Sequence, residues 1–217
     1  MSALSGGISW LSDGAHWHGE DGFPHRILQH LGYTALTVAI AAAIAIPLGL
    51  WIGHTGRLRG LAIALTGALR ALPTLGLLTL VVIWRGIGLT PPIVALVVLA
   101  IPPLLAGAYA GLEAVDRATL DAARAIGMTE WQVLGKVEIP LAMPLILGGL
   151  RAAVLQVVAT ATVAAYIGLG GLGRFVMDGL AVRDYPQMVA GSLLVVVLAL
   201  ALDGLFAVTQ RAFSPHR

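Results

Sequence analysis

The sequence has no cysteine, and only 11% of its 217 residues are charged. The absence of cysteine excludes disulfides, zinc–thiolate sites and thiol catalysis. The formal net charge of +2 is too small for a nucleic-acid-binding protein. Soluble domains have about 25% charged residues, so this chain lacks the charge that covers a soluble surface.

In place of charge the chain has hydrophobic residues, which make up 58% of it, and its mean hydropathy is +0.90. A soluble domain of this length could not bury so much apolar surface in one core. Membrane helices need about 20 mostly apolar residues. Five windows meet that need: Tyr33–Gly53, Leu61–Trp84, Ile93–Leu112, Leu145–Ile167 and Met188–Val208.

These windows lack the period-two alternation of a membrane β-barrel. The sequence therefore predicts an all-α membrane protein with about five transmembrane helices. Four prolines interrupt the windows, which membrane helices tolerate when neighbouring helices satisfy the freed carbonyls. We expect Leu72-Pro73-Thr74 to mark a kink or a short unwound stretch in the second span.

The domain organisation follows from the spans. Residues 1–32 form an external N-terminal segment without the pattern of a signal peptide, residues 33–210 the transmembrane domain, and residues 211–217 a cytoplasmic tail. With the N-terminus outside, the inner segments hold seven basic residues against four in the outer ones, and the positive-inside rule favours that orientation. The inner ones are Arg57, Arg59, Arg117, Arg124, Lys136, Arg211 and Arg217, and the outer ones are Arg26, Arg85, Arg174 and Arg183.

The longest internal polar stretch, residues 113–140, lies between the third and fourth spans and on this orientation is cytoplasmic. We expect a helix from Glu113 to Ile126, a left-handed cap at Gly127, and a second helix over Glu130–Val137 that Thr129 caps and Pro140 ends. The result is a helix-turn-helix. A plain connector would not need this length, but the residues alone leave connector and docking element both open.

Within this stretch Asp121-Ala122-Ala123, Gly127 and Val137-Glu138-Ile139-Pro140 resemble the EAA loop of ABC-importer permeases in residue type and spacing. Ala71-Leu72-Pro73-Thr74-Leu75, the segment from Ala161 to Gly173 and Leu202-Asp203-Gly204-Leu205-Phe206 are similar to segments of the betaine, choline and osmoprotectant branch. The resemblance covers roughly residues 30–210.

The resemblance implies a type I importer in the bacterial cytoplasmic membrane, specific for a small osmolyte such as glycine betaine, choline or carnitine. It also implies several partners: ATPase subunits that bind ATP and Mg²⁺, a second permease copy, identical or similar, and an external substrate-binding protein. The chain has no phosphate-binding loop of the Gly-x-x-x-x-Gly-Lys-Ser/Thr kind, so ATP hydrolysis is expected in a partner and no cofactor in this chain. We expect Asp121, Ala122, Ala123 and Gly127 to form the ATPase-docking surface, with Ile139-Pro140 fixing the return into the fourth span.

The glycine block Gly168, Gly170, Gly171 and Gly173 matches the dinucleotide-binding spacing, but no βαβ unit surrounds it. We expect a tight turn at the outer end of the fourth span that takes part in docking the binding protein. A role of these glycines in packing two permease copies or in an external gate is the alternative interpretation. The Gly49-x-x-x-Gly53 spacing is frequent by chance among 27 glycines, and we base no prediction on it.

Three charged residues fall inside the spans, where charge is costly and usually faces the bundle interior. Arg70, beside Pro73 and Thr74, either lines the pathway or gate or pairs with Asp203. Arg151 is expected to extend its guanidinium to the cytoplasmic surface, and Asp203 to pair helices. The histidines of the first 32 residues are expected to be solvated rather than metal-bound, and no metal site is predicted.

No catalytic constellation emerges within the spans, so the chain is expected to be a transport subunit rather than an enzyme. The alternatives are a methionine or other amino-acid permease, a stand-alone secondary carrier, and a membrane scaffold. A carrier commonly shows internal repeats, and none is visible here.

Overall fold

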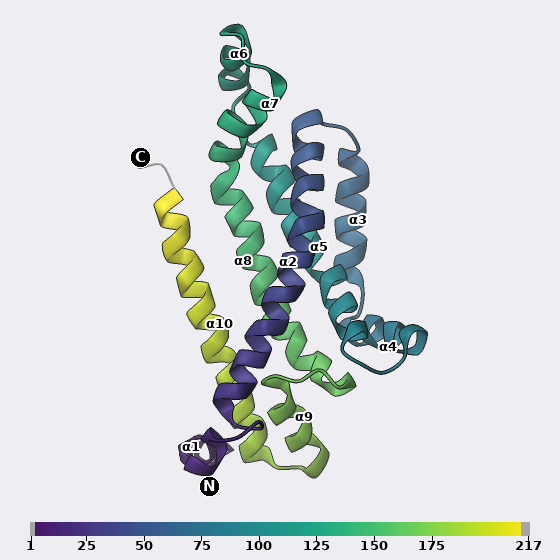
Figure 1. Ribbon diagram of the computed structural model, residues 1–217, viewed down its shortest axis with the longest axis vertical. Coiled ribbons are helices and arrows are strands. Elements are labelled where there is room, and N and C mark those ends of the chain that lie inside the picture. Colours follow the sequence, from purple (N-terminus) through teal and green to yellow (C-terminus); the bar gives the residue numbers. More distant parts are fainter. Residues whose placement is uncertain (1–2, 214–217) are drawn as a thin grey trace. The chain divides into compact units, whose positions relative to one another are not determined.

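The computed structural model describes residues 3–213, and within that range every regular element is helical (Figure 1). Two 3₁₀ turns (Gly14–Trp17 and Ala165–Ile167) and one π turn (Leu134–Glu138) accompany the α-helices. The α-helices are α1 (Ala3–Ser12), α2 (Phe23–Thr55), α3 (Arg59–Ala71), α4 (Thr74–Arg85), α5 (Thr90–Glu113), α6 (Arg117–Ala125), α7 (Glu130–Val133), α8 (Ile139–Ala164), α9 (Gly173–Val182) and α10 (Tyr185–Phe213).

The chain divides into two compact units. The first unit holds the residues up to Val38, Leu72–Val97 and Val154–Asp203, and the second holds Ala39–Ala71, Val98–Ala153 and the residues from Gly204 onward. The long helices α2, α5, α8 and α10 each contribute one segment to each unit.

Within the described residues, four helical stretches are long and apolar enough to cross a membrane: Phe23–Thr55, Thr90–Glu113, Glu130–Ile167 and Tyr185–Arg211. A fifth span results if α3 and α4 count as one broken span. The prediction of an all-α membrane protein with about five spans is therefore confirmed.

One predicted span is broken as expected and another begins earlier than predicted. Leu61–Trp84 forms two helices, because the chain breaks at Leu72–Pro73, where Pro73 adopts an extended conformation (φ −67°, ψ 121°). The expected unwound stretch is therefore confirmed. The first span begins at Phe23, ten residues before the predicted Tyr33. Residues 23–32 looked too polar for a span, but Gln29 and His30 bond to the backbone at Gly171 and Val158, which satisfies them inside the fold.

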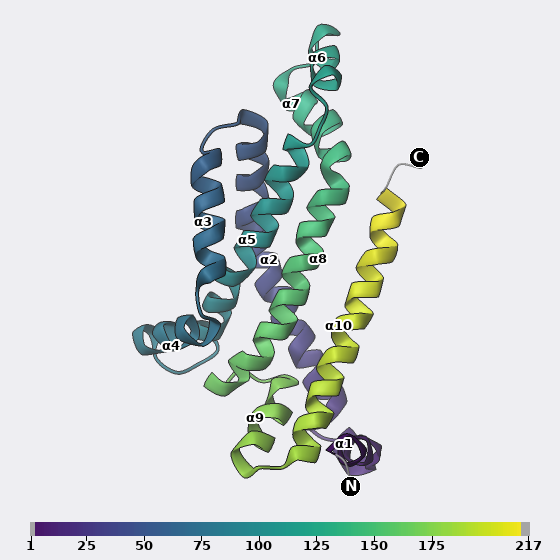
Figure 2. The ribbon, with the colours of Figure 1, turned by 180° about the vertical axis from the view of Figure 1, so that it is seen from behind.

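The N-terminal segment is part of the first unit and packs within it rather than extending freely into solvent. Phe23 and Phe175 are buried together with Leu172, and Trp10 packs against them, its ring stacked on His16 with centroids 3.7 Å apart. Figure 2 shows α1 beside the start of α10, where Gly7 faces Val189. The prediction of solvated histidines is thus wrong for His16, half-buried on Trp10, and for His30, which is fully buried.

In the second unit, close helix crossings depend on glycine. A Cβ atom at Gly49 would lie 2.7 Å from Ala108 Cβ, and one at Gly53 would lie 2.8 Å from Leu112 Cβ. Both glycines therefore allow α2 to approach α5 closely, as small residues do in membrane helix pairs. The Gly49-x-x-x-Gly53 spacing, from which no contact is predicted, is therefore a packing motif. Figures 1 and 2 both show α3 alongside the last turns of α2.

Candidate functional site

The predicted helix-turn-helix is α6 and α7 of the second unit. Helix α6 ends in a Schellman motif: Gly127 has φ +88°, its N–H bonds to the carbonyl of Arg124, and the N–H of Met128 bonds to the carbonyl of Ala123. The left-handed cap predicted at Gly127 is confirmed. The first helix starts at Arg117 rather than Glu113, because α5 continues to Glu113 and Asp116 takes the N-cap position of α6.

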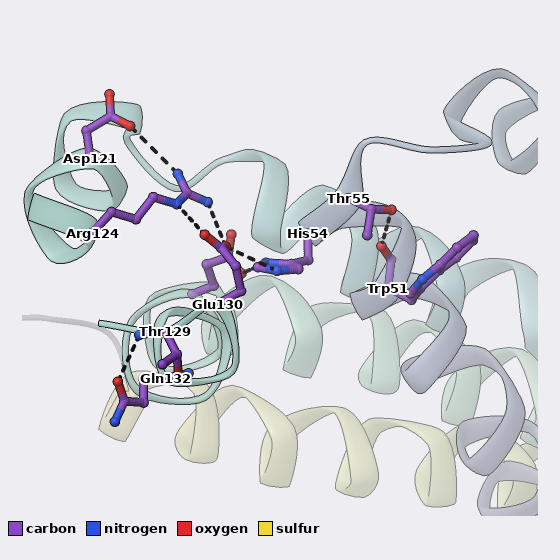
Figure 3. A network of polar contacts seen from close by, with 9 residues as sticks. Trp51, His54, Thr55, Asp121, Arg124, Thr129, Glu130 and Gln132 are labelled. Carbon is purple, nitrogen blue, oxygen red and sulfur yellow. Dashed lines mark hydrogen bonds and ion pairs between the residues drawn. The ribbon is translucent and has the colours of Figure 1, made fainter. Parts of the chain in front are cut away.

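Helix α7 begins with a capping box. The Thr129 hydroxyl accepts from the backbone N–H of Gln132, and the Gln132 side chain accepts from the backbone N–H of Thr129 (Figure 3). Contrary to the prediction, the helix does not end at Pro140. It passes through the π turn Leu134–Glu138, in which Ile139 N–H bonds to the carbonyl of Leu134, and continues as α8. Pro140 then occupies the second position of α8, directly after Ile139, whose N–H closes the π turn.

The residues predicted to dock the ATPase lie on one small element but differ in exposure. Asp121 and Ala122 are exposed on α6, whereas Ala123 is buried and Ile139 is half-buried. Exposed apolar side chains flank them: Ile126 is 81% exposed and Trp131 84%. Large exposed apolar groups mark contact surfaces. Trp131, which the sequence analysis did not single out, therefore belongs to the candidate docking surface.

A chain of polar contacts joins this element to the end of α2. Arg124 donates two hydrogen bonds to the Glu130 carboxylate, at 2.9 and 3.0 Å. His54 lies between two carboxylates, with Nδ1 2.6 Å from Glu138 Oε2 and Nε2 3.5 Å from Glu130 Oε2. Figure 3 shows His54 and Arg124 reaching Glu130 from opposite sides. The contacts therefore link α2, α6, α7 and the π turn.

The members of this network differ in burial. Glu138 is 3% exposed, so the carboxylate depends on His54 for its polar partner, because a buried unpaired charge is costly. Arg124 and Glu130 lie on the surface, and their hydrogen bond raises the pKa of Arg124 above its ordinary value and lowers the pKa of Glu130. The buried His54–Glu138 pair is thus the structural anchor, and the Arg124–Glu130 pair extends it to α6.

A cavity of about 500 Å³ opens beside this network. Its polar lining includes His54, Glu138 and Arg124, together with Arg59 and Glu113, which form an ion pair of 2.5 Å. The lining carries both signs of charge. The cavity therefore lies between the end of α2 and α6, which the ion pairs connect only through Glu130 of α7.

Sequence reasoning missed His54 and Glu138 as a pair because 84 positions separate them. A local signal does exist. Glu138 is an acidic residue where the helix turns apolar, and His54 is a histidine at the end of an otherwise apolar window. Both residues place a polar side chain at the edge of a membrane span, where a polar partner is expected.

The glycine block lies in the first unit, between the 3₁₀ turn that follows α8 and the start of α9. Gly168 and Gly171 have φ values of +93° and +82°, and the N–H of Gly171 donates to Gln29 Oε1 at 2.9 Å. A Cβ at Gly173 would collide with the carbonyl oxygen of Thr162, and one at Gly170 would collide with the Gln29 side chain. The glycines thus form a tight turn, as expected, closed by the beginning of α2.

The charged residues of the spans have different surroundings. In the second unit Arg151 donates a hydrogen bond to Gln210 of α10 at 3.1 Å, so its guanidinium has a partner inside the helix bundle. Asp203 is half-buried on α10 and also has a polar interaction. Arg70 is exposed near the end of α3, just before the break at Pro73, and Thr74 begins α4. No group of histidine and acidic side chains among the described residues could hold a metal ion.

Comparison with known proteins identifies the class. The profile of the family described as "Binding-protein-dependent transport system inner membrane component" matches residues 45–215. The glycine betaine/carnitine/choline transport system permease protein OpuCB of Bacillus subtilis is 33% identical over 187 residues, covering 86% of each chain. The osmoprotectant import permease protein OsmW of Salmonella typhimurium is 36% identical over 195 residues, covering 86% of this chain and 89% of its own.

A solved structure shares the fold. A chain of the MetNI methionine ABC transporter, in an inward-facing conformation, superposes with a TM-score of 0.77 at 22% identity, covering 88% of this chain and 96% of its own. The protein therefore belongs to the binding-protein-dependent transport system inner membrane components, the permeases of type I ABC importers. Within them it falls in the osmoprotectant branch, as a multi-pass inner-membrane protein.

Proposed function

We propose that this permease imports a small quaternary ammonium osmolyte, of the glycine betaine, carnitine or choline kind, with energy from ATP and Mg²⁺ bound by a separate ATPase. The observation that carries the proposal is the similarity to relatives named for these substrates, which extends over 86% of the chain. Two permease copies, each with an ATPase, would receive substrate from an external binding protein. The N-terminus would then face outward and residues 113–140 the cytoplasm, in agreement with the distribution of basic residues.

Residues 113–140 would carry the coupling. The site combines a small-residue turn around Ala122, Ala123 and Gly127 with the exposed side chains of Ile126 and Trp131. Such an element can fit into a groove of the ATPase. Ile139 and Pro140 join it directly to α8, and the His54 network ties it to α2. Movement of a docked ATPase would therefore reach two membrane helices at once.

The test is uptake into proteoliposomes that hold the permease with or without its ATPase and binding protein. Uptake of glycine betaine that needs all three components, and ATP hydrolysis that rises with loaded binding protein, are expected. Uptake by the permease alone would mean a secondary carrier. Inhibition by methionine but by no quaternary ammonium compound would mean an amino-acid permease, and either result would overturn the proposal.

Replacing Gly127 with leucine is expected to weaken ATPase binding about 5- to 30-fold, the equivalent of one or two kcal/mol. A side chain there meets no neighbour within 4 Å, so the effect comes from the left-handed φ of +88°, which costs a β-carbon residue roughly 1–2 kcal/mol. Titration of the purified ATPase onto immobilised permease measures it.

Gly127→Asn is the matched control, because asparagine adopts the left-handed conformation more readily than other residues with a side chain. It should bind the ATPase nearly as the wild type does. Normal binding and uptake by the leucine variant would remove Gly127 from the docking turn.

A further inference from the structure

Arg70 lies deep in the membrane. Helix α3 starts at Arg59, whose ion pair with Glu113 belongs at a membrane surface. Leu61 is the first residue of the apolar run, and nine residues at 1.5 Å each put Arg70 about 14 Å further along the helix. Half of the hydrocarbon thickness is about 15 Å. The guanidinium is therefore near the midplane, too deep to reach the surface by extending its side chain.

The side chain of Arg70 has no ion pair or hydrogen bond within residues 3–213 and is exposed on the surface of this chain. Arg151, the other arginine within a predicted span, has a hydrogen-bond partner in Gln210. A charged group at this depth almost always faces water or a polar partner. Arg70 therefore points to a water-filled space that this chain lines, and in an importer that space is the substrate pathway.

On the basis of the proposed function, we propose that Arg70 selects osmolytes that carry a carboxylate. Guanidinium and carboxylate form paired, charge-assisted hydrogen bonds, so a zwitterion such as glycine betaine or carnitine gains a partner at the midplane. Choline has the same quaternary ammonium group but a hydroxyl in place of the carboxylate, and the positive charge of Arg70 repels it. Arg70 is thus a specificity-determining residue.

The first test compares uptake of glycine betaine and choline by the complete importer. We expect Arg70→Gln to raise the KM for glycine betaine at least tenfold, whereas choline uptake stays level or rises. Arg70→Lys keeps the charge but loses the paired geometry, and should fall between. Arg57→Gln is the matched control, since Arg57 is exposed in the turn before α3, outside the span, and should behave as the wild type.

The second test does not depend on transport. Because the chain has no cysteine, Arg70→Cys introduces one thiol into each copy of the permease in the assembled importer. A charged, water-soluble thiol reagent should modify it, and glycine betaine should slow the reaction. Leu65→Cys, about 140° around the same helix at 100° per residue, should react much more slowly, as a lipid-facing or packed position would.

The outcomes separate the two proposals. If the wild type imports glycine betaine but Arg70→Gln changes both substrates equally or neither, carboxylate selection is wrong and the proposed function stands. An unreactive thiol in the Arg70→Cys variant would equally contradict a pathway position. If the wild type imports no quaternary ammonium compound, the proposed function fails, and the assignment of Arg70 to these carboxylates fails with it.

Discussion

Replacing Glu138 with alanine is expected to separate ATP hydrolysis from uptake, lowering the substrate imported per ATP at least tenfold while hydrolysis continues. Glu138 is buried, and its carboxylate lies 2.6 Å from His54 Nδ1 at the end of α2. Removing one partner of a buried hydrogen bond leaves the other group unsatisfied, which costs about 1–3 kcal/mol and more for a charged group. Without Glu138 the π turn loses its contact with His54, which keeps only the longer contact with Glu130 at 3.5 Å, so the docked ATPase would move α8 but hold α2 only weakly.

A loss of folding has to be distinguished from a loss of coupling. Glu138→Gln retains a side-chain oxygen that can accept from His54, and should recover much of the imported substrate per ATP. The double variant His54→Leu/Glu138→Leu replaces the pair with apolar groups, a change that often leaves stability intact, and should fold but remain uncoupled. Glu20→Gln, an exposed glutamate of the N-terminal segment, is the neutral control.

The measurement uses proteoliposomes that contain permease, ATPase and binding protein, with uptake and phosphate release recorded in the same sample. A Glu138→Ala importer with the wild-type ratio of substrate to ATP would show that the His54–Glu138 pair only stabilises the fold. An importer in which hydrolysis also stops would place Glu138 in ATPase docking rather than in the link to α2.

The features that local chemistry determines could be predicted from the sequence. The lengths of the apolar runs predict the spans, and the proline at position 73 predicts the break between α3 and α4. Capping residues predict the turn at Gly127 and the start of α7 after Thr129. Each of these depends on residues within a few positions of one another. The predicted helix end at Pro140 is wrong, because the helix continues through the π turn Leu134–Glu138 and past Pro140. No local residue pattern indicates that π turn.

The missed features depend on contacts between distant segments. His54 and Glu138 meet only because α2 and the π turn pack together, and Gly49 is a contact residue only because α5 crosses it. Neither crossing can be read from one sequence, since the same glycine spacing occurs by chance. The burial of His30 has the same cause, since its partner Val158 is 128 positions away. The neighbours of His16 are local, because Trp10 and Phe23 lie within seven positions of it.

The crossing of α5 and α8 is expected to be essential for folding. Helix α5 leads into residues 113–140, and α8 continues from them. A Cβ at Gly107 would lie 2.7 Å from the Cα of Gly149, and a Cβ at Gly149 would lie 2.7 Å from the carbonyl oxygen of Pro103. Both contacts involve backbone atoms, so no side chain can rotate away. The two helices are therefore packed backbone against backbone at this crossing, which suits an element that transmits force.

Gly107→Leu is expected to prevent stable folding, and Gly107→Ala to lower the melting temperature clearly. Overpacking costs about 1–3 kcal/mol where side chains can adjust, and here the backbones themselves must separate. Gly204→Leu is the matched control, since this glycine of α10 has no atom within 4 Å of its added Cβ and a helix gains from losing glycine. Heating followed by size-exclusion chromatography in detergent compares the variants, and a monodisperse Gly107→Leu protein with unchanged melting would show that α5 and α8 are not held by this contact.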